Sequence, residues 1–131
     1  MYLSHSQSPR TLDLAAGLIG TRELVRSAAA EAALPPERVA EAVLAAHEVA
    51  MNALTHGHGH GAVRIWRADS ELVCEVEDHG PGLSDPNEGR RPPDTRRDRG
   101  RGLWITRQLC DRVEIESAPG GTLVRLHWQL G

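Results

Sequence analysis

The segment Glu48-Val-Ala-Met-Asn-Ala-Leu-Thr-His56 carries three polar residues spaced four apart, Glu48, Asn52 and His56. On a helix this spacing places all three side chains on the same side. Apolar residues fill positions between them, so we expect the polar stripe to border the buried face, where a polar group needs a purpose. A glutamate can act as a general base, and an asparagine oxygen is a suitable ligand for Mg²⁺. The alternative is a stripe that simply faces solvent.

The helix that carries this stripe is predicted from Glu37 to about Thr55, where apolar residues recur with helical spacing. A second helix is predicted upstream, from Leu12 to Leu34, and it ends at the double proline Pro35-Pro36. Residues 1 to 10 show no such pattern and are expected to form a flexible tail. The domain itself is therefore predicted to cover residues 11–131.

Strands are predicted where apolar and polar residues alternate. Four such segments pair into two hairpins, Ala62–Ala68 with Glu71–Glu77 and Arg112–Glu116 with Thr122–Trp128. A short helix, Leu103–Asp111, precedes the second hairpin. Because helices and strands form separate runs along the chain, we predict one domain with a helix layer and a sheet layer.

At 131 residues the chain is long enough for one domain and too short for two ordinary ones. Its 40% hydrophobic and 25% charged residues exclude a disordered acidic tail and a membrane protein. The first residues lack the apolar core of a secretion signal, so we expect the cytoplasm, with Cys74 and Cys110 as reduced core thiols. All 15 basic residues are arginine, which excludes Schiff-base lysine chemistry and a phosphate-binding loop that ends in Gly-Lys-Ser/Thr.

The long segment from His79 to Arg101 is rich in glycine, proline, arginine and aspartate, and its length is typical of a functional lid or a disordered loop. Residues 89–101 contain six arginines and two aspartates, a local charge of +4 that leaves −7 for the rest of a chain whose net charge is −3. Two interpretations stay open, a solvated loop and an anion-binding loop. Nucleic acid is the less favoured anion, because no aromatic residues are interleaved and the rest of the surface is acidic.

Two glycine motifs flank this segment. Asp78-His-Gly-Pro-Gly82 directly follows a strand, and a carboxylate there can accept a hydrogen bond from an exocyclic amine such as that of adenine. Gly100-Arg-Gly-Leu103 precedes a helix, where free backbone N–H groups can meet phosphates. A strand-ending turn and a flexible hinge are the respective alternatives.

Taken in order, four motifs resemble the nucleotide-binding boxes of the GHKL (Bergerat-fold) ATPases: Glu48-x-x-x-Asn52, Asp78-x-Gly80-x-Gly82, Gly100-x-Gly102-Leu103 and Gly121-Thr122. The resemblance covers about residues 13 to 130. Within this group, the small size, the continuation Asn-Ala-x-x-His and the phrase Gly-Leu-Trp-Ile-Thr-Arg-Gln-Leu-Cys-Asp look most like the anti-sigma-factor serine kinases. The implied fold is α+β, a two-layer α/β sandwich of the Bergerat or histidine-kinase ATPase type, with a mixed, mostly antiparallel sheet covered by helices on one face.

The resemblance also implies a role for each matching residue. Glu48 would activate the attacking hydroxyl or water, and Asn52 would ligate the Mg²⁺ that bridges the ATP phosphates. Asp78 would bind the adenine amino group, with Thr122 supporting that contact directly or through water. The other members of the boxes would make room for the base or bind the phosphates through backbone amides: Gly80, Gly82, Gly100, Arg101, Gly102 and Leu103. Residues 83 to about 101 would form the ATP lid.

By the same resemblance, we expect an ATP-binding anti-sigma factor with serine/threonine protein kinase activity. Its partners would be a sigma factor and an antagonist protein that accepts the phosphoryl group on serine, and a homodimer is the assembly implied. Neither direct nucleic-acid binding nor membrane binding is expected. Two alternatives stay open: a module that binds ATP or sequesters a partner without catalysis, and the detached ATP domain of a sensor histidine kinase system, whose phosphoacceptor histidine would lie on another chain.

His56, His58 and His60 form a His-x-His-x-His run that suggests a metal site, because imidazoles on alternate residues of an extended segment share a face. The other interpretation is a glycine-punctuated turn with exposed histidines. We favour the turn, since no carboxylate or cysteine completes a ligand set.

Overall fold

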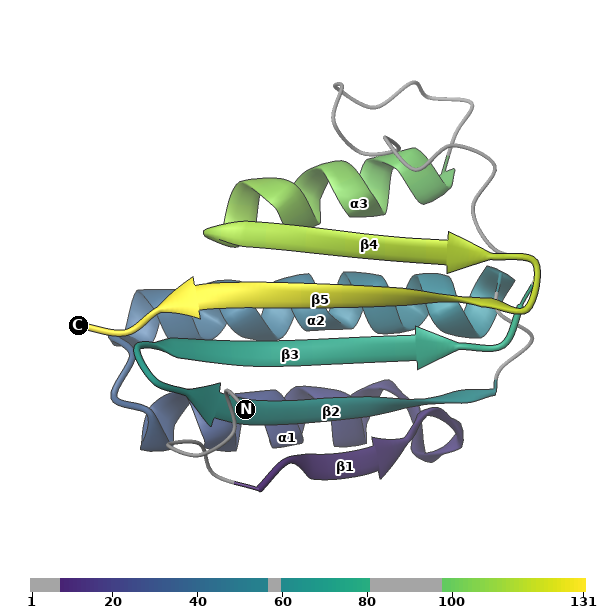
Figure 1. Cartoon of the computed structure of the whole chain (residues 1–131). Helices are drawn as coiled ribbons and strands as arrows, with labels where there is room; N and C mark the ends of the chain where they lie inside the picture. The colour runs from purple at the N-terminus through teal and green to yellow at the C-terminus, as the bar shows by residue number, and fades with distance from the viewer. Residues whose placement is uncertain (1–7, 57–59, 81–97) are drawn as a thin grey trace.

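The computed structural model describes residues 8–56, 60–80 and 98–131, which form a sheet layer and a helix layer (Figure 1). Five strands make up the sheet: β1 (Arg10–Asp13), β2 (Gly61–Ala68), β3 (Glu71–Asp78), β4 (Arg112–Ala118) and β5 (Gly121–Gln129). Their order across the sheet is β1-β2-β3-β5-β4, and every neighbouring pair is antiparallel. The helices are α1 (Gly17–Glu31), α2 (Pro36–His56) and α3 (Asp98–Leu109), together with a 3₁₀ turn, η2 (Leu14–Ala16).

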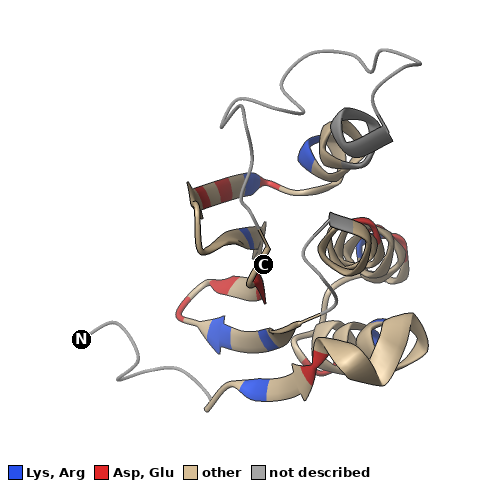
Figure 2. Ribbon diagram, turned by 90° about the vertical axis from the view of Figure 1, so that its right-hand side faces the viewer, with Lys and Arg blue, Asp and Glu red and all other residues tan. Residues whose placement is uncertain are grey.

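The three α-helices lie on one face of the sheet and leave the other face open (Figure 2). Within the helix layer α2 lies between α1 and α3 and contacts both. The predicted two-layer α+β fold, with helices on one face of a mostly antiparallel sheet, is confirmed. Among the described residues, no helix combines the length and the apolar character needed to cross a membrane.

The core forms between the sheet and α2. Register partners on neighbouring strands point to the same face. Two rows of partners therefore face the helices, Ile65, Cys74, Leu126 and Val113 in one and Val63, Val76, Val124 and Ile115 in the other. The side of α2 that meets these rows is built from small buried residues, Ala42, Ala45, Ala46, Val49, Ala50 and Ala53. Small side chains let α2 lie close to the sheet, and this close packing fixes the position of the polar residues on the same helix.

The side chain of Trp128 joins β5 to α3. It is fully buried in the core, and its Nε1 donates a hydrogen bond to the carbonyl oxygen of Leu109 at 3.1 Å. A buried indole N–H without such a partner would be costly. The contact therefore holds the end of α3 against the strand that also carries Thr122.

On the open face of the sheet, charged residues pair with one another across the strands. Arg64, Glu75, Arg125 and Glu114 are register partners on β2, β3, β5 and β4. Glu75 accepts hydrogen bonds from Arg64 Nη1 at 3.0 Å and from Arg125 Nη2 at 2.9 Å. Although partial burial acts to lower the pKa of Arg125, the hydrogen bond and the charge of Glu75 raise it above its ordinary value. The charges in this row thus neutralise one another.

The prediction of a continuous helix from Leu12 to Leu34 is wrong at its start. The segment Arg10–Asp13 is an edge strand, β1, and it pairs with β2 from Arg10 opposite Ile65 to Asp13 opposite Ala62. The side chain of Asp13 then caps η2 by accepting a hydrogen bond from the N–H of Ala15 at 2.8 Å. Sheet pairing has overridden the helical spacing, and α1 begins only at Gly17, whose φ of +91° is unsuited to other residues.

The predicted start of the third helix is also wrong. The sequence predicts a helix from Leu103 to Asp111, with Gly100 and Gly102 ahead of it, whereas α3 runs from Asp98 to Leu109 and contains both glycines. Each glycine inside a helix costs about 1 kcal/mol relative to alanine. Packing of α3 on α2, which buries Leu103 and Thr106, offsets this cost.

Candidate active site

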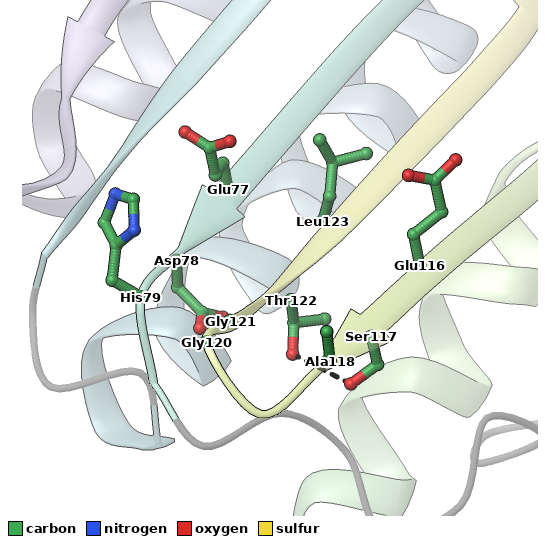
Figure 3. A pocket seen from close by; sticks show the side chains of 10 residues that line it. All are labelled: Glu77, Asp78, His79, Glu116, Ser117, Ala118, Gly120, Gly121, Thr122 and Leu123. Carbon is green, nitrogen blue, oxygen red and sulfur yellow. Dashed lines mark hydrogen bonds between the residues drawn. The ribbon is translucent and has the colours of Figure 1, made fainter.

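The side chains of Asp78 and Thr122 lie side by side at one end of the sheet (Figure 3). Asp78 is the last residue of β3, Thr122 lies near the start of β5, and the two are register partners. Because side chains alternate along a strand, both point to the same face as Val76 and Val124, which is the face covered by helices. Asp78 also accepts a hydrogen bond from the backbone N–H of Gly80 through Oδ1 at 2.9 Å, so the chain turns sharply just after the carboxylate.

Gly121 allows β5 to approach β3 at this point. Its φ is +154°, and a Cβ atom built on it would lie 2.1 Å from the backbone carbonyl oxygen of Asp78. Any other residue here would push the two strands apart beside the carboxylate. The glycine of the Gly121-Thr122 motif is therefore needed for the close approach of β5 to β3.

We expect Gly121→Ala to lower the free energy of unfolding by about 1–3 kcal/mol, because the substitution adds both backbone strain and a clash with Asp78. Chemical denaturation followed by circular dichroism measures the change. Gly120→Ala is the matched control, because a Cβ at Gly120 meets nothing within 4 Å. Equal losses of stability in the two variants would contradict this account of Gly121.

A pocket lies between α2, α3 and the ends of β3 and β5. It is lined by Val49, Asn52, Ala53, Val76, Asp78, Leu103, Thr122 and Val124. Four residues that were singled out from the sequence thus meet here: Asn52, Asp78, Leu103 and Thr122. The pocket encloses about 20 Å³, compared with roughly 300–1,000 Å³ for small-molecule sites, so its walls must separate to admit a ligand.

Asn52 brings an unsatisfied polar atom to this pocket. Its Nδ2 is buried and has no hydrogen-bond partner within the part of the chain that the structure describes. Leaving a buried donor unpaired costs about 1–3 kcal/mol. The amide also carries an oxygen, so it can donate to a phosphate oxygen and coordinate a metal ion. The residue therefore fits a bound nucleotide with its cation.

Glu48 lies one helical turn before Asn52 on α2 and is half-buried. It is not among the residues that line the pocket, so the structure places it on the same side of the helix but beside the pocket rather than in it. His56 is the last residue of α2, and its side chain lies outside the described part of the chain. Of the three residues in the predicted polar stripe, Asn52 lines the pocket and Glu48 lies beside it, and the side chain of His56 is not described.

The predicted phosphate-binding residues fall partly on α3. Gly100 and Arg101 are among the first four residues of this helix, whose backbone N–H groups have no acceptor within the helix. That end of the helix carries partial positive charge and favours anions. Gly80 is buried next to Asp78, whereas Gly82 and most of the proposed lid, residues 83–101, lie outside the described residues.

A second, larger hollow of about 300 Å³ opens on the outer side of the Asp78–Thr122 pair (Figure 3). It is lined by Glu77, Asp78, His79, Glu116, Ser117, Ala118, Gly120, Gly121, Thr122 and Leu123. Ser117 was missed by the sequence analysis, although it is the register partner of Thr122 and its Oγ lies 3.4 Å from Thr122 Oγ1. The sequence places Ser117 between the two predicted strands of the second hairpin, whereas the structure includes it in β4.

The cysteines contribute no nucleophile. Burial raises the pKa of the Cys74 thiol to about 12, and burial likewise raises the pKa of Cys110 above its ordinary value. Both are free thiols that stay protonated near neutral pH. Residues 8–56, 60–80 and 98–131 contain no cluster of three metal-binding side chains, and the His56 side chain and His58 of the histidine run lie outside the described residues.

The sequence matches the family model of the histidine kinase-like ATPase domain over residues 13–128. An anti-sigma F factor from Caldanaerobacter subterraneus subsp. tengcongensis is 30% identical over 119 residues, which cover 84% of this chain and 83% of the relative. Among solved structures, the RsbU and RsbW domains of Rv1364c from Mycobacterium tuberculosis align with a TM-score of 0.69 at 21% identity. The alignment covers 95% of this chain and 32% of that one.

The histidine kinase domain of the blue-light activated histidine kinase EL346 from Erythrobacter litoralis aligns with a TM-score of 0.59 at 21% identity. That alignment covers 91% of this chain and 62% of the other. The chain thus spans about a third of the first structure and less than two thirds of the second. Both structural similarities concern the fold.

Proposed function

The chain belongs to the family of histidine kinase-like ATPase domains, and from this premise we propose that it is an anti-sigma factor with ATP-dependent serine/threonine protein kinase activity. In this proposal it binds a sigma factor and phosphorylates a serine of that factor's antagonist, in the cytoplasm. The observation that carries the proposal is that Asn52, whose buried Nδ2 has no hydrogen-bond partner among the described residues, lines one pocket with Asp78 and Thr122. The relatives named anti-sigma F factors support the choice of partners.

The adenine end of ATP would lie at Asp78. A carboxylate at the end of a buried strand accepts a hydrogen bond from the exocyclic amine, and the Thr122 hydroxyl supports the contact. Val49, Ala53 and Val124 supply apolar walls for the base. This contact would select adenine over guanine. Where adenine carries its amine, guanine carries a carbonyl oxygen, and the carboxylate would repel that oxygen.

The phosphates would lie between Asn52 and the first turn of α3. The Asn52 amide would ligate Mg²⁺, and the N–H groups of Gly100 and Arg101 would meet phosphate oxygens. Bound Mg²⁺ neutralises the charge that develops on the transferred phosphoryl group. The protein then has mainly to position the groups, and Glu48 orients the attacking serine hydroxyl and takes up its proton.

Transfer of label tests this proposal. Purified protein is incubated with radiolabelled ATP, Mg²⁺ and an antagonist protein encoded in its own operon, and the label is expected on serine in an acid-stable form. Formation of a partner complex without any label would favour the sequestering module. Acid-labile label on a histidine of another chain would favour the detached domain of a sensor system.

A further inference from the structure

The end of the sheet that carries Asp78 and Thr122 also carries Ser117, and the three residues form one polar row. Ser117 on β4 is the register partner of Thr122 on β5, which is in turn the register partner of Asp78 on β3. Register partners point to the same face, so this row lies next to the apolar, helix-facing row that contains Val76 and Val124. The polar row therefore begins where the apolar core ends.

The hydroxyl groups of Ser117 and Thr122 are in hydrogen-bond contact (Figure 3). Ser117 Oγ lies 3.4 Å from Thr122 Oγ1, and either oxygen can be the donor. Thr122 is buried and lines both the pocket of Asn52 and the outer hollow. Ser117 is exposed and lines the hollow but not the pocket. It can therefore act on a ligand in the pocket only through the Thr122 hydroxyl.

The direction of this hydrogen bond decides what Thr122 offers to a nucleotide. A hydroxyl group has one hydrogen to donate and two lone pairs that accept. If Thr122 donates to Ser117, it can only accept a hydrogen bond from a ligand in the pocket. If Ser117 donates to Thr122, the Thr122 O–H stays available as a donor.

An adenine ring in the proposed site requires the second arrangement. Its exocyclic amine donates to Asp78, and the neighbouring ring nitrogen, N1, carries no hydrogen and acts as an acceptor. An ionised carboxylate only accepts hydrogen bonds, so Asp78 cannot satisfy N1. Thr122 is the register partner of Asp78 and lines the same pocket, which makes its hydroxyl the suitable donor.

We propose that Ser117 is a positioning residue for the base: it donates its hydroxyl hydrogen to Thr122 Oγ1 and leaves the Thr122 O–H free to donate to adenine N1, directly or through a water. This inference rests on the proposed function, because it needs adenine at Asp78. Guanine and hypoxanthine carry a hydrogen on N1 and would bring a donor to a donor. Asp78 and Thr122 thus recognise two neighbouring atoms of one base.

A purely structural role of the contact between Ser117 and Thr122 makes a different prediction. The contact joins β4 to β5 next to the last pair before the turn, Ala118 with Gly121. Its loss would then loosen the hairpin and weaken every ligand of the pocket alike. In a positioning role, the loss affects only ligands with an acceptor at N1, so an ATP analogue without N1 separates the two roles.

Isothermal titration calorimetry with Mg²⁺ compares ATP with 1-deaza-ATP, in which a C–H group replaces N1. Ser117→Ala is expected to weaken ATP binding about fivefold, the size of one neutral hydrogen bond, and to change 1-deaza-ATP binding by less than about twofold. An equal loss for both ligands overturns the proposal, and so does wild-type affinity for both.

Ser117→Thr and Ser117→Val are a matched pair, because threonine and valine have nearly the same shape and only threonine keeps a hydroxyl group. Ser117 is exposed, so we expect both variants to fold. The threonine variant should bind ATP within about twofold of wild type, and the valine variant should show the loss expected for alanine. Equal ATP affinity of the two variants would mean that the hydroxyl group has no role.

Ser70→Ala is the control for the loss of a serine hydroxyl. Ser70 is exposed in the turn between β2 and β3, at the opposite end of the sheet from Asp78. Its replacement should leave the affinities for ATP and 1-deaza-ATP unchanged. A change equal to that of Ser117→Ala would remove the specific role of Ser117.

The same measurements separate this inference from the proposed function. A wild-type protein that binds no ATP refutes both the ATP site and the role of Ser117. A protein that binds ATP and transfers label, but loses ATP and 1-deaza-ATP affinity equally in Ser117→Ala, refutes the role of Ser117 alone. A protein that shows the expected difference between the two ligands, but transfers no label, refutes the kinase and keeps Ser117 as a positioning residue.

Discussion

Asn52→Ala is expected to weaken Mg²⁺-dependent ATP binding about 100-fold or more, which is roughly 3 kcal/mol, and at the same time to stabilise the fold. The loss of binding follows because the amide is the proposed metal ligand, Asn52 lines the pocket, and its buried Nδ2 has no hydrogen-bond partner among the described residues. The gain in stability follows because the same atom is desolvated in the protein without ligand. Alanine also has a higher helix propensity than asparagine. We expect the free energy of unfolding to rise by about 1 kcal/mol.

Isothermal titration calorimetry with and without Mg²⁺ measures the first effect, and urea denaturation without nucleotide measures the second. Thr55→Ala is the control for helix propensity, since Thr55 is exposed on α2 and does not line the pocket. It should leave ATP binding unchanged and alter stability by only a few tenths of a kcal/mol. If Asn52→Ala loses stability and keeps binding, Asn52 has a structural role and the site is misassigned.

Glu48→Gln is expected to lower the rate of phosphoryl transfer by about 10²–10⁴-fold while ATP affinity stays within about twofold, because a glutamine cannot accept the proton of the attacking hydroxyl. We expect the rate to fall and the ATP affinity to stay nearly unchanged because Glu48 lies beside the pocket rather than among its lining residues. Single-turnover transfer to the antagonist measures the rate, and calorimetry measures the affinity.

Glu37→Gln is the matched control for this substitution. Glu37 is an exposed residue in the first turn of the same helix, far along the sequence from Asn52. Its replacement makes the same chemical change with no expected effect on transfer. A Glu48→Gln protein that transfers phosphate at the normal rate would remove Glu48 from the chemistry and leave the ATP site intact.

Local pattern was enough to predict most of the secondary structure. Alternation of apolar and polar residues predicted both hairpins closely, although β3 also buries Val73 and Glu75, which point to its other face. The strand β1 was not predicted, because Leu12 and Leu14 also fit the spacing of a helix. Only the pairing of Arg10–Asp13 with β2 makes this segment a strand. A four-residue edge strand has too few alternating positions to compete with a long helical pattern.

For the candidate site, the sequence suggested which residues to consider but not how close together they lie in the folded protein. Asn52, Asp78 and Thr122 are far apart along the chain, and they meet because α2 packs on the sheet at the point where β3 pairs with β5. That Asn52 Nδ2 finds no hydrogen-bond partner within the described residues depends on that packing, and no residue pattern predicts it. Ser117 was missed for the same reason, because its relevance comes only from its register with Thr122.

The last strand of the described chain lies inside the sheet rather than at its edge, and this has a consequence for biosynthesis. Because β5 inserts between β3 and β4, a ribosome-bound chain that ends before Gly121 contains β1 to β4, but β3 is an open edge and β4 has no strand to pair with. Unpaired sheet edges recruit other chains and promote aggregation. The segment that brings Thr122 to Asp78 is also the one that covers this edge. Pairing of β5 with β3 therefore brings Thr122 beside Asp78 and covers the open edge of β3 in the same step.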